Sequence, residues 1–599
     1  MAKSKSKPKP NAKQRQLLRD RQFDGMLARI AAAFLVTITA FYPIYLSPRA
    51  YLGITYDKTL FLWVTAAVAS ALVLFMFVCA KGGFRLDNYY VAGEPRRRVA
   101  AAEWALLGFI AWAFLSAFVA HWMNPEWMRF DAASGGAVSI RPSQIVWRGY
   151  FGRYEGFFSY LAYAVCFAIT ARLYKPRRLH MLLIAGGAVI VSLIGILQFV
   201  GVDFLPWRPD GQQWTFGLFP FDLDHRMITD IYGNRLMGPT SAFFRTTLGN
   251  VNLVSAYCSF AVLLFAALFA ASRSKSKGWR WLYFGACALS FALSFTTGHS
   301  GDAHIVAIFG AMVLLVPYWI SCRVRLGRVL LVLASWCAVY AAHNAYMTAM
   351  QRRLLEGGSF PPSEAHLLYL HSPAPIWALF ALGGVLLAGG LALLLIAKKW
   401  LPARPLRIAC AAAVPVLLIS GMVGLEIVGS RLSDQPGSFV WQAREMMHFR
   451  MDDSFGSGRG FIWRNAVEVI PYNPIFGTGP DTFYYALGGF GGERQTLAAE
   501  LHGEVYDKAH NVFLQIAVCM GIPALVAYLI FLGGVFIPAV KAAFDRPVLL
   551  AFGAAALSYV IQGFFMVEVP ITTPLVWIAF GVIAAETWMA KIGCQSADV

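Results

Sequence analysis

The feature that most constrains this chain is a series of apolar runs, each long enough to cross a lipid bilayer. A hydrocarbon core of about 30 Å is crossed by about 20 apolar residues in a helix. About fourteen such runs can be counted. They begin near Gly25, Thr59, Trp104, Gly156, Met181, Val251, Trp281, Ala303, Val329, Pro375, Ile408, Asn511, Val548 and Ile571. The sequence therefore predicts an all-α polytopic membrane protein.

Positive charge in the short loops predicts how the chain is oriented. The chain is 58% hydrophobic and 14% charged, with a formal net charge of +19. Lysine and arginine cluster in the N-terminal tail and in every second connection, which places both termini in the cytoplasm. The basic connections are at 96–98, 175–178, 273–280, 323–328, 398–407 and 541–546. This pattern explains most of the charge through orientation and membrane lipid, so we expect no nucleic-acid partner.

The expected spans and loops divide the chain into five parts. They are a basic cytoplasmic tail (1–24), helices 1–11 (25–428) with outer loops at 121–155, 201–250 and 348–374, a large outer loop (429–509), helices 12–14 (510–590) and a cytoplasmic tail (591–599). Loops this long usually carry function or structure of their own. The outer side is therefore where we look for chemistry.

Arginines occur on that outer side in polar and aromatic surroundings, against the positive-inside rule. They are Arg148, Arg153, Arg226, Arg235, Arg245, Arg444, Arg450, Arg459, Arg464 and Arg494. A planar guanidinium matches the oxygens of a phosphate or diphosphate in a two-point contact. The set favours an anionic ligand, although any one arginine is also compatible with an ion pair to a nearby acid or lipid headgroup.

The largest loop contains a predicted surface helix in "GRGFIWRNAVEVIPYNPIFGTGPDTF". Its apolar residues recur at helical spacing until Pro471 ends the helix. Arg459 and Trp463 lie one turn apart and share a face. The turn that follows, with Gly477 and Gly479, is predicted to bring backbone amides near an anion.

A histidine follows this loop in "DKAHNVFLQ", at the start of the expected twelfth span. A neutral imidazole at a water–membrane boundary can accept a proton near neutral pH, and a carboxylate can orient it. His510 is thus a candidate base, with Asp507 in a supporting role. A helix-end histidine capped by water remains the alternative, and Asp507 is also compatible with a pair to Lys508 or Arg494.

Three stretches together resemble the O-antigen ligase and O-antigen polymerase superfamily of bacterial envelope glycan transferases. They are "FFRTTLGNVNLVSAY", the helix stretch quoted above, and "DKAHNVFLQIAVCMGIPALVAYLIFL", with "GRYEGFFSYLAY" as an upstream companion. The resemblance implies a GT-C-like helical fold. It implies that His510 is the catalytic base and that Arg245 and Arg459 bind the donor diphosphate. Supporting positions are Asn250, Asn252, Trp463, Arg153 and Asp507. Many relatives have Ser-Arg where this chain has "TTGHSGDAH"; if that arginine contacts donor phosphate in the relatives, His299 or another arginine must substitute here.

The chemistry implied by the resemblance is transfer of a glycan from undecaprenyl diphosphate to a hydroxyl on a sugar, lipid or protein. It would take place at the outer face of the bacterial plasma membrane, with inversion at the anomeric carbon. No cofactor and no metal are expected. The sequence leaves open whether the enzyme is a ligase, a chain polymerase or a protein O-glycosyltransferase.

Two other classes stay open as alternatives. A metal-dependent lipid-linked sugar transferase would use paired acids, for which Asp222 with Asp224 and Asp452 with Asp453 are candidates. A flippase or exporter of lipid-linked oligosaccharide would also have a dozen or more spans. The expected mark of that class is an internal repeat, which this sequence does not display.

Overall fold

The fold was obtained as a computed structural model, which describes most of the chain. The described residues are 12–47, 53–79, 100–123, 127–131, 136–199, 202–203, 219–220, 244–272, 277–297, 303–320, 325–356, 373–396, isolated positions within 412–427, and 444–594 except 449, 451, 454, 490, 503 and 504. Most of the expected outer loops at 201–250 and 348–374 lies outside these ranges.

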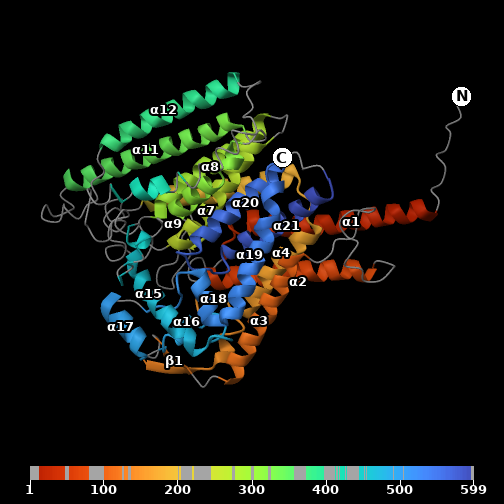
Figure 1. The fold of residues 1–599 in the computed structure, drawn as a ribbon, viewed down its shortest axis with the longest axis vertical. Helices are drawn as coiled ribbons and strands as arrows, with labels where there is room; N and C mark the ends of the chain where they lie inside the picture. The colour runs from red at the N-terminus through yellow and green to blue at the C-terminus, as the bar shows by residue number, and fades with distance from the viewer. Residues whose placement is uncertain are drawn as a thin grey trace.

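The described chain is built almost entirely of helices, as the apolar runs predict (Figure 1). In the first half they are α1 (Ala12–Val36), α2 (Ile54–Cys79), α3 (Ala101–Met123), α4 (Phe157–Leu173), α5 (Arg178–Phe199), α7 (Val251–Ala271), α8 (Lys277–Ser294), α9 (Ala303–Leu314), α10 (Val316–Trp319), α11 (Leu326–Glu356) and α12 (Pro373–Ile396). In the second half they are α15 (Phe455–Val469), α16 (Phe483–Ala486), α17 (Glu493–His502), α18 (Val512–Met520), α19 (Ile522–Ala542), α20 (Pro547–Gln562) and α21 (Thr573–Lys591). Short π- and 3-10 segments are η1 (Thr37–Phe41), η3 (Pro142–Gln144) and η6 (Ile470–Tyr472).

Helix α7 forms the centre of the bundle. All of its apolar span is buried inside the protein, and it packs against α8, α9 and α20. Helix α4 packs on α21 and α3 on α19, which joins the two ends of the chain in one core. Helices α11 and α12 pack on each other at the edge of the bundle (Figure 1), where α12 leaves most of its apolar surface exposed. That exposed apolar surface suits contact with lipid.

Within the described residues, nine helices are long and apolar enough to cross a membrane. Three further apolar helices, α4, α9 and α20, are shorter than 18 residues. The prediction of an all-α polytopic membrane protein is confirmed. The number fourteen and the GT-C-like arrangement stay predictions.

The run expected to form one span from Asn511 is divided by the structure into two helices. Helix α18 ends at Met520 and α19 begins at Ile522; Gly521 between them has a φ of +84°, which belongs to the left-handed region. A side chain at Gly521 would lie 2.0 Å from the carbonyl oxygen of Ile475. The break therefore allows the 474–479 turn to pack against the chain between the two helices.

Short antiparallel strand pairs lie between the helices. Strands β1 (Trp127–Asp131) and β2 (Gly136–Ile140) pair from Trp127 opposite Ile140 to Asp131 opposite Gly136. Strands β3 (Val202–Asp203) and β4 (Phe219–Pro220) form a second pair, and β5 (Phe244–Arg245) and β6 (Gly249–Asn250) a third. Strand β1 and helices α15, α16 and α17 gather on one side of the bundle, away from both chain ends (Figure 1). The short helices expected in the large loop are thus confirmed.

Candidate functional site

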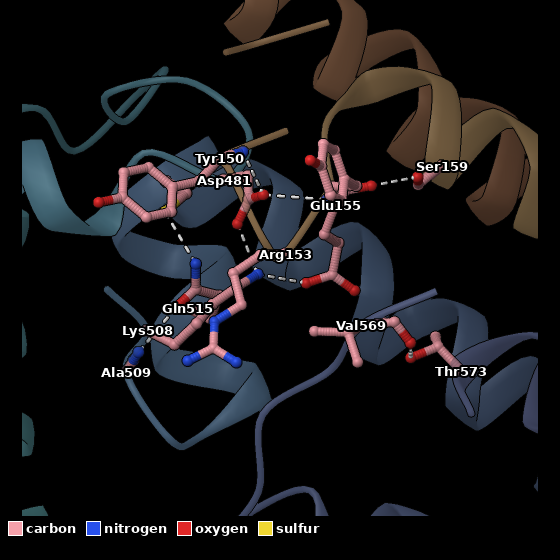
Figure 2. Close-up of polar contacts among 12 residues, drawn as sticks. Tyr150, Arg153, Glu155, Ser159, Asp481, Lys508, Ala509, Gln515, Val569 and Thr573 are labelled. Carbon is pink, nitrogen blue, oxygen red and sulfur yellow. Dashed lines mark hydrogen bonds and ion pairs between the residues drawn. The ribbon is translucent and has the colours of Figure 1, made fainter. Parts of the chain in front are cut away.

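Lys508 is buried and pairs with carboxylates from two other segments of the chain. The Nζ atom of Lys508 lies 2.6 Å from Glu155 Oε2 and 2.6 Å from Asp481 Oδ1, and each of the three side chains is at most 1% exposed. Figure 2 shows Lys508 between the two carboxylates. Asp481 also accepts hydrogen bonds from the backbone N–H groups of Tyr150 (2.6 Å) and Glu155 (2.9 Å). A cation paired this way fixes the segment before α4 against the segment before α18.

Charge and burial act in opposite directions within this cluster. The two carboxylates raise the pKa of Lys508, which stays charged although burial opposes it. Burial raises the pKa of Glu155 to about 7, and Lys508 limits that rise. The lysine is therefore the charged centre on which the cluster depends.

Asp507 is held by an arginine from the segment before α4. Arg153 contacts it through two hydrogen bonds, from Nε to Oδ2 at 2.8 Å and from Nη2 to Oδ1 at 3.0 Å. This contact differs from the alternative in which Asp507 pairs with Lys508 or Arg494. Lys508 is occupied by the buried cluster, and Arg494 lies 3.3 Å from Glu468. A two-point arginine–carboxylate contact fixes both side chains, so Asp507 has a defined place near His510.

His510 occupies a strained position directly before α18. Its φ is +49°, which non-glycine residues rarely adopt. The next residue, Asn511, caps α18 by accepting hydrogen bonds from the N–H groups of Phe513 (3.0 Å) and Leu514 (3.1 Å). On the other side, the N–H of Ala509 donates to Gln515 Oε1 at 2.8 Å. The backbone is thus fixed on both sides of the half-buried imidazole.

The surroundings of His510 keep its imidazole uncharged. Burial is the largest cause that lowers its pKa, followed by the charges of Arg459 and Arg153, and the result is about 3. Asp507 opposes this effect and Lys508 adds to it. At neutral pH the ring therefore has a nitrogen lone pair free to accept a proton, although its basicity is low while the cations beside it are not neutralised.

Helix α15 brings Arg459 and Trp463 to the same place, as their spacing predicts. Trp463 Nε1 donates to the carbonyl oxygen of Ala509 at 3.1 Å, directly beside His510. Arg459 Nη1 donates to the carbonyl oxygen of Gly456 at 2.6 Å, and its charge acts on the imidazole. The helix predicted from "GRGFIWRNAVEV" is confirmed, and it begins earlier than expected, at Phe455.

The strand pair that contains Arg245 is described through its backbone, with Arg245 opposite Gly249. At its tip the Thr246 N–H donates to Gln198 Oε1 (2.6 Å), and Thr247 Oγ1 donates to the carbonyl oxygen of Pro43 (2.5 Å). Asn250 caps α7, accepting a hydrogen bond from the Asn252 N–H at 2.8 Å. For Asn250 the observed contact is therefore that of a helix cap.

Tyr42 connects this strand pair to the connection between α20 and α21. It directly precedes Pro43, whose carbonyl oxygen binds Thr247, and its hydroxyl donates to the carbonyl oxygen of Pro570. The strand pair with Arg245 and the 563–572 connection thus lie at the same end of the bundle.

Backbone strain is concentrated around the sequence-predicted residues. Among the described residues, four other than glycine have positive φ: Tyr154 (55°), Thr246 (55°), Asp481 (63°) and His510 (49°). Two of them directly follow Arg153 and Arg245, and the others belong to the site itself. Each such conformation costs about 1–3 kcal/mol and is typical of functional sites.

The turn that was expected to offer amides to an anion has another role. The N–H of Gly477 donates to the carbonyl oxygen of Asn473 at 2.9 Å, that of Thr478 to Val518 at 3.2 Å, and that of Gly479 to Cys519 at 2.7 Å. These donors are used within the protein. The prediction of an anion site there is wrong, because the turn packs on the end of α18.

Several outer arginines form ion pairs with carboxylates instead of facing an open site. Arg444 pairs with Glu426 at 3.0 Å and Arg464 with Asp453 at 2.6 Å. The pair to Asp453 uses one of the acids named as a possible metal ligand. Of the other named acids, Asp452 is described, whereas Asp222 and Asp224 lie outside the described residues, as do Arg226, Arg235 and His299.

Sequence reasoning did not identify Lys508, Glu155 and Asp481 as one cluster. From the sequence Lys508 is interpreted only as a possible partner of Asp507, and neither Glu155 nor Asp481 stands out. The signal present in the sequence was weak: a lone acid in "GRYEGFF" and another in "TGPDTF". Glu155 lies 353 positions from Lys508 along the chain, and Asp481 lies several helical turns from it, so no local spacing predicts the cluster.

Comparison with known proteins agrees with the family resemblance. Residues 367–529 match the family model described as O-antigen ligase. This range contains Arg459 and His510, whereas Arg153 and Arg245 precede it. A comparison with curated proteins gave no match. The resemblance to the O-antigen ligase superfamily is confirmed over the matched range, and the apolar helices make the chain a multi-pass membrane protein.

Proposed function

We propose that this chain, which carries an O-antigen ligase domain at residues 367–529, transfers a glycan from undecaprenyl diphosphate to an acceptor hydroxyl. The reaction takes place at the outer face of the bacterial plasma membrane. The observation that carries the proposal is the uncharged imidazole of His510, held in a strained backbone beside Arg459 and the Arg153–Asp507 pair. A base next to fixed cations suits a reaction that removes a proton and releases a diphosphate.

In the proposed reaction the acceptor oxygen attacks the anomeric carbon of the donor sugar. The new carbon–oxygen bond forms as the bond from that carbon to the diphosphate oxygen breaks, with inversion at the carbon. The acceptor proton passes to a ring nitrogen of His510, and undecaprenyl diphosphate leaves with the bonding electrons. Arg459 and Arg245 stabilise the negative charge that grows on the diphosphate. The step requires no metal and no cofactor.

Donor binding also adjusts the base in this proposal. The charge of Arg459 is the second cause of the low pKa of His510, after burial. A diphosphate bound to Arg459 offsets that charge, so the pKa of His510 rises toward its ordinary value of 6.5. The histidine therefore becomes an effective base when the donor is in place.

The contacts around His510 fit supporting roles for Trp463 and Asp507. Trp463 fixes the carbonyl group next to the histidine, and the Arg153–Asp507 pair places a carboxylate near the ring. Asp507 raises the pKa of His510, so it supports the protonated form that appears during transfer. Neither residue needs to touch the donor sugar to act in this way.

Deleting the gene tests the proposed function in cells. Surface polymer should be lost or shortened to one repeat, and glycan should accumulate on its lipid carrier, as seen by gel electrophoresis and mass spectrometry. Purified protein should then transfer the accumulated lipid-linked glycan in liposomes with excess chelator present. Protein that moved this lipid between leaflets and never altered its glycan would be a flippase, contrary to the proposal.

A further inference from the structure

A second carboxylate shares a pocket with His510. Helices α20 and α21 are joined by residues 563–572, and Glu568 lies on this connection. The residues that line this pocket include Met566, Val567 and Glu568 from the connection, together with Glu155, Lys508 and His510. Glu568 is an acid between apolar residues in "FFMVEVP", and neither the sequence motifs nor the proposed mechanism has assigned it a role.

The backbone on either side of Glu568 is firmly held. Val567 and Val569 are buried, and the carbonyl oxygen of Val569 accepts a hydrogen bond from Thr573 Oγ1 at 3.0 Å. At the start of the connection, the Val512 N–H donates to the carbonyl oxygen of Gly563 at 2.8 Å. That bond ties the connection to the first residue of α18, two residues after His510. The carboxyl group is thus held on a fixed backbone, in the same pocket as the base.

Glu568 differs from the other acids around the site. Lys508 occupies Glu155 and Asp481, and Arg153 occupies Asp507. Among the described residues, none forms a hydrogen bond or ion pair with the Glu568 carboxylate, and Glu568 is partly buried. A partly buried carboxylate without such a partner is costly, so a ligand that donates a hydrogen bond would be favoured there.

We propose that Glu568 binds a hydroxyl group of the acceptor and orients it toward His510. The proposal rests on the proposed function, in which the acceptor attacks through a hydroxyl. The positive charge of Arg459 attracts the anionic diphosphate to its side of the pocket, which leaves the Glu568 side to the uncharged acceptor. Glu568 is in this way a residue that determines where each substrate binds.

The protonation behaviour of Glu568 agrees with a hydroxyl ligand. Burial raises its pKa well above the usual 4.5, and the neighbouring Glu155 adds to the rise while Lys508 opposes it. A carboxylate accepts a hydrogen bond from a hydroxyl, and a carboxylic acid can both accept one and donate one. A hydroxyl therefore fits both forms, whereas a cation would require the charged form.

Steady-state kinetics of Glu568→Ala and Glu568→Gln would test this role. The donor is the lipid-linked glycan that accumulates in cells lacking the gene, and the acceptor probe is the envelope glycan and lipid fraction of the same cells. A hydrogen bond to a charged group corresponds to about a 10- to 100-fold change in affinity. Glu568→Ala should raise the KM for the acceptor fraction by about that factor and leave the donor KM unchanged. Glu568→Gln, which still hydrogen-bonds, should raise it less.

Glu500→Gln is the matched control, because Glu500 is exposed on α17. It should leave both constants unchanged. A purely structural role of Glu568 would change both constants together at matched amounts of folded protein, which would overturn the inference. So would an acceptor KM within about twofold of wild type.

If Glu568→Ala fails to insert in the membrane, Glu568→Gln decides by the same measurement. An acceptor KM raised more than about twofold supports the inference, and a smaller change overturns it. The proposed function is tested separately, by the transfer activity of the wild-type protein. Transfer by the wild-type protein with an unaffected Glu568 variant would remove the inference alone, whereas a wild-type protein without transfer activity would remove both.

Discussion

Replacing Lys508 with methionine should destabilise the protein more than any other single lysine substitution among those that the structure describes. The side chain has nearly the same length but no charge, so Glu155 and Asp481 would remain buried without their cation. Removing one partner of a buried ion pair costs about 3–5 kcal/mol, and here one cation serves two carboxylates. At pH 8 we therefore expect Lys508→Met to lower the free energy of unfolding by an amount near the upper end of that range.

The loss should depend on pH in a defined direction. Burial raises the folded-state pKa of Glu155 to about 7, above its ordinary 4.5. A raised folded pKa contributes stability that is present below pH 4.5 and is lost as pH rises through about 7. Without Lys508 this pKa rises further, because the nearby positive charge is gone. The variant should thus be closer to wild type at pH 5 than at pH 8.

Thermal unfolding of the purified protein in lipid nanodiscs, followed by tryptophan fluorescence at one scan rate, measures this effect. Lys591→Met is the matched control, since Lys591 is exposed at the end of α21 and should change the midpoint little. The double variant Lys508→Met with Glu155→Gln should recover part of the loss, because one buried charge is removed. Equal midpoints of Lys508→Met and wild type at pH 8 would refute the buried-cluster argument.

Three further predictions concern the site and its supports. Arg459→Ala should lower the transfer rate by about 10²–10³-fold, and Arg459→Lys should be only partly active. Arg464→Ala on the same helix is the control and should be near wild type, so equal rates for the two alanine variants would assign Arg459 a structural role. As pH falls, kcat/KM should stay high well below pH 6.5, because the pKa of His510 in the free enzyme is about 3. With donor bound, kcat should decline nearer pH 6.5. Profiles of kcat and kcat/KM that coincide would contradict the proposed rise in the pKa of His510 on diphosphate binding. Gly477→Ala should destabilise the fold by about 2 kcal/mol or more, because the new methyl group would lie 2.3 Å from the backbone of α18. Gly152→Ala, which places its methyl group in open space, is the control and should cost less, so equal unfolding midpoints of the two variants would contradict this reasoning.

The parts of the fold that the sequence predicted are those governed by local patterns. Apolar runs anticipated α4, α7 and α21, and helical spacing anticipated that Arg459 and Trp463 share a face. Both depend on residues within a few turns of one another. For the same reason the sequence predicted α15 and its end near Pro471.

The parts that the sequence missed depend on residues brought together by folding. Lys508 and Glu155 are 353 positions apart, so their ion pair leaves no periodic signal. For Asp507 the sequence left open a local pair with Lys508 or Arg494, whereas it binds Arg153, because the segment before α4 packs against the segment before α18. The 474–479 turn has the glycines of an anion site, but the end of α18 occupies its donors. Glycine spacing alone does not distinguish a ligand from a neighbouring helix.

The most direct test of the account is the transfer rate of His510→Gln on a defined undecaprenyl-diphosphate glycan, in liposomes and with an excess of acceptor. Glutamine keeps much of the size and hydrogen bonding of histidine but cannot act as a base. We predict a rate about 10²–10⁴ lower than wild type with unchanged donor binding, and a near wild-type rate for His448→Gln, whose histidine is exposed and paired with Glu426. A His510→Gln rate within about tenfold of wild type would contradict the assignment of His510 as the base.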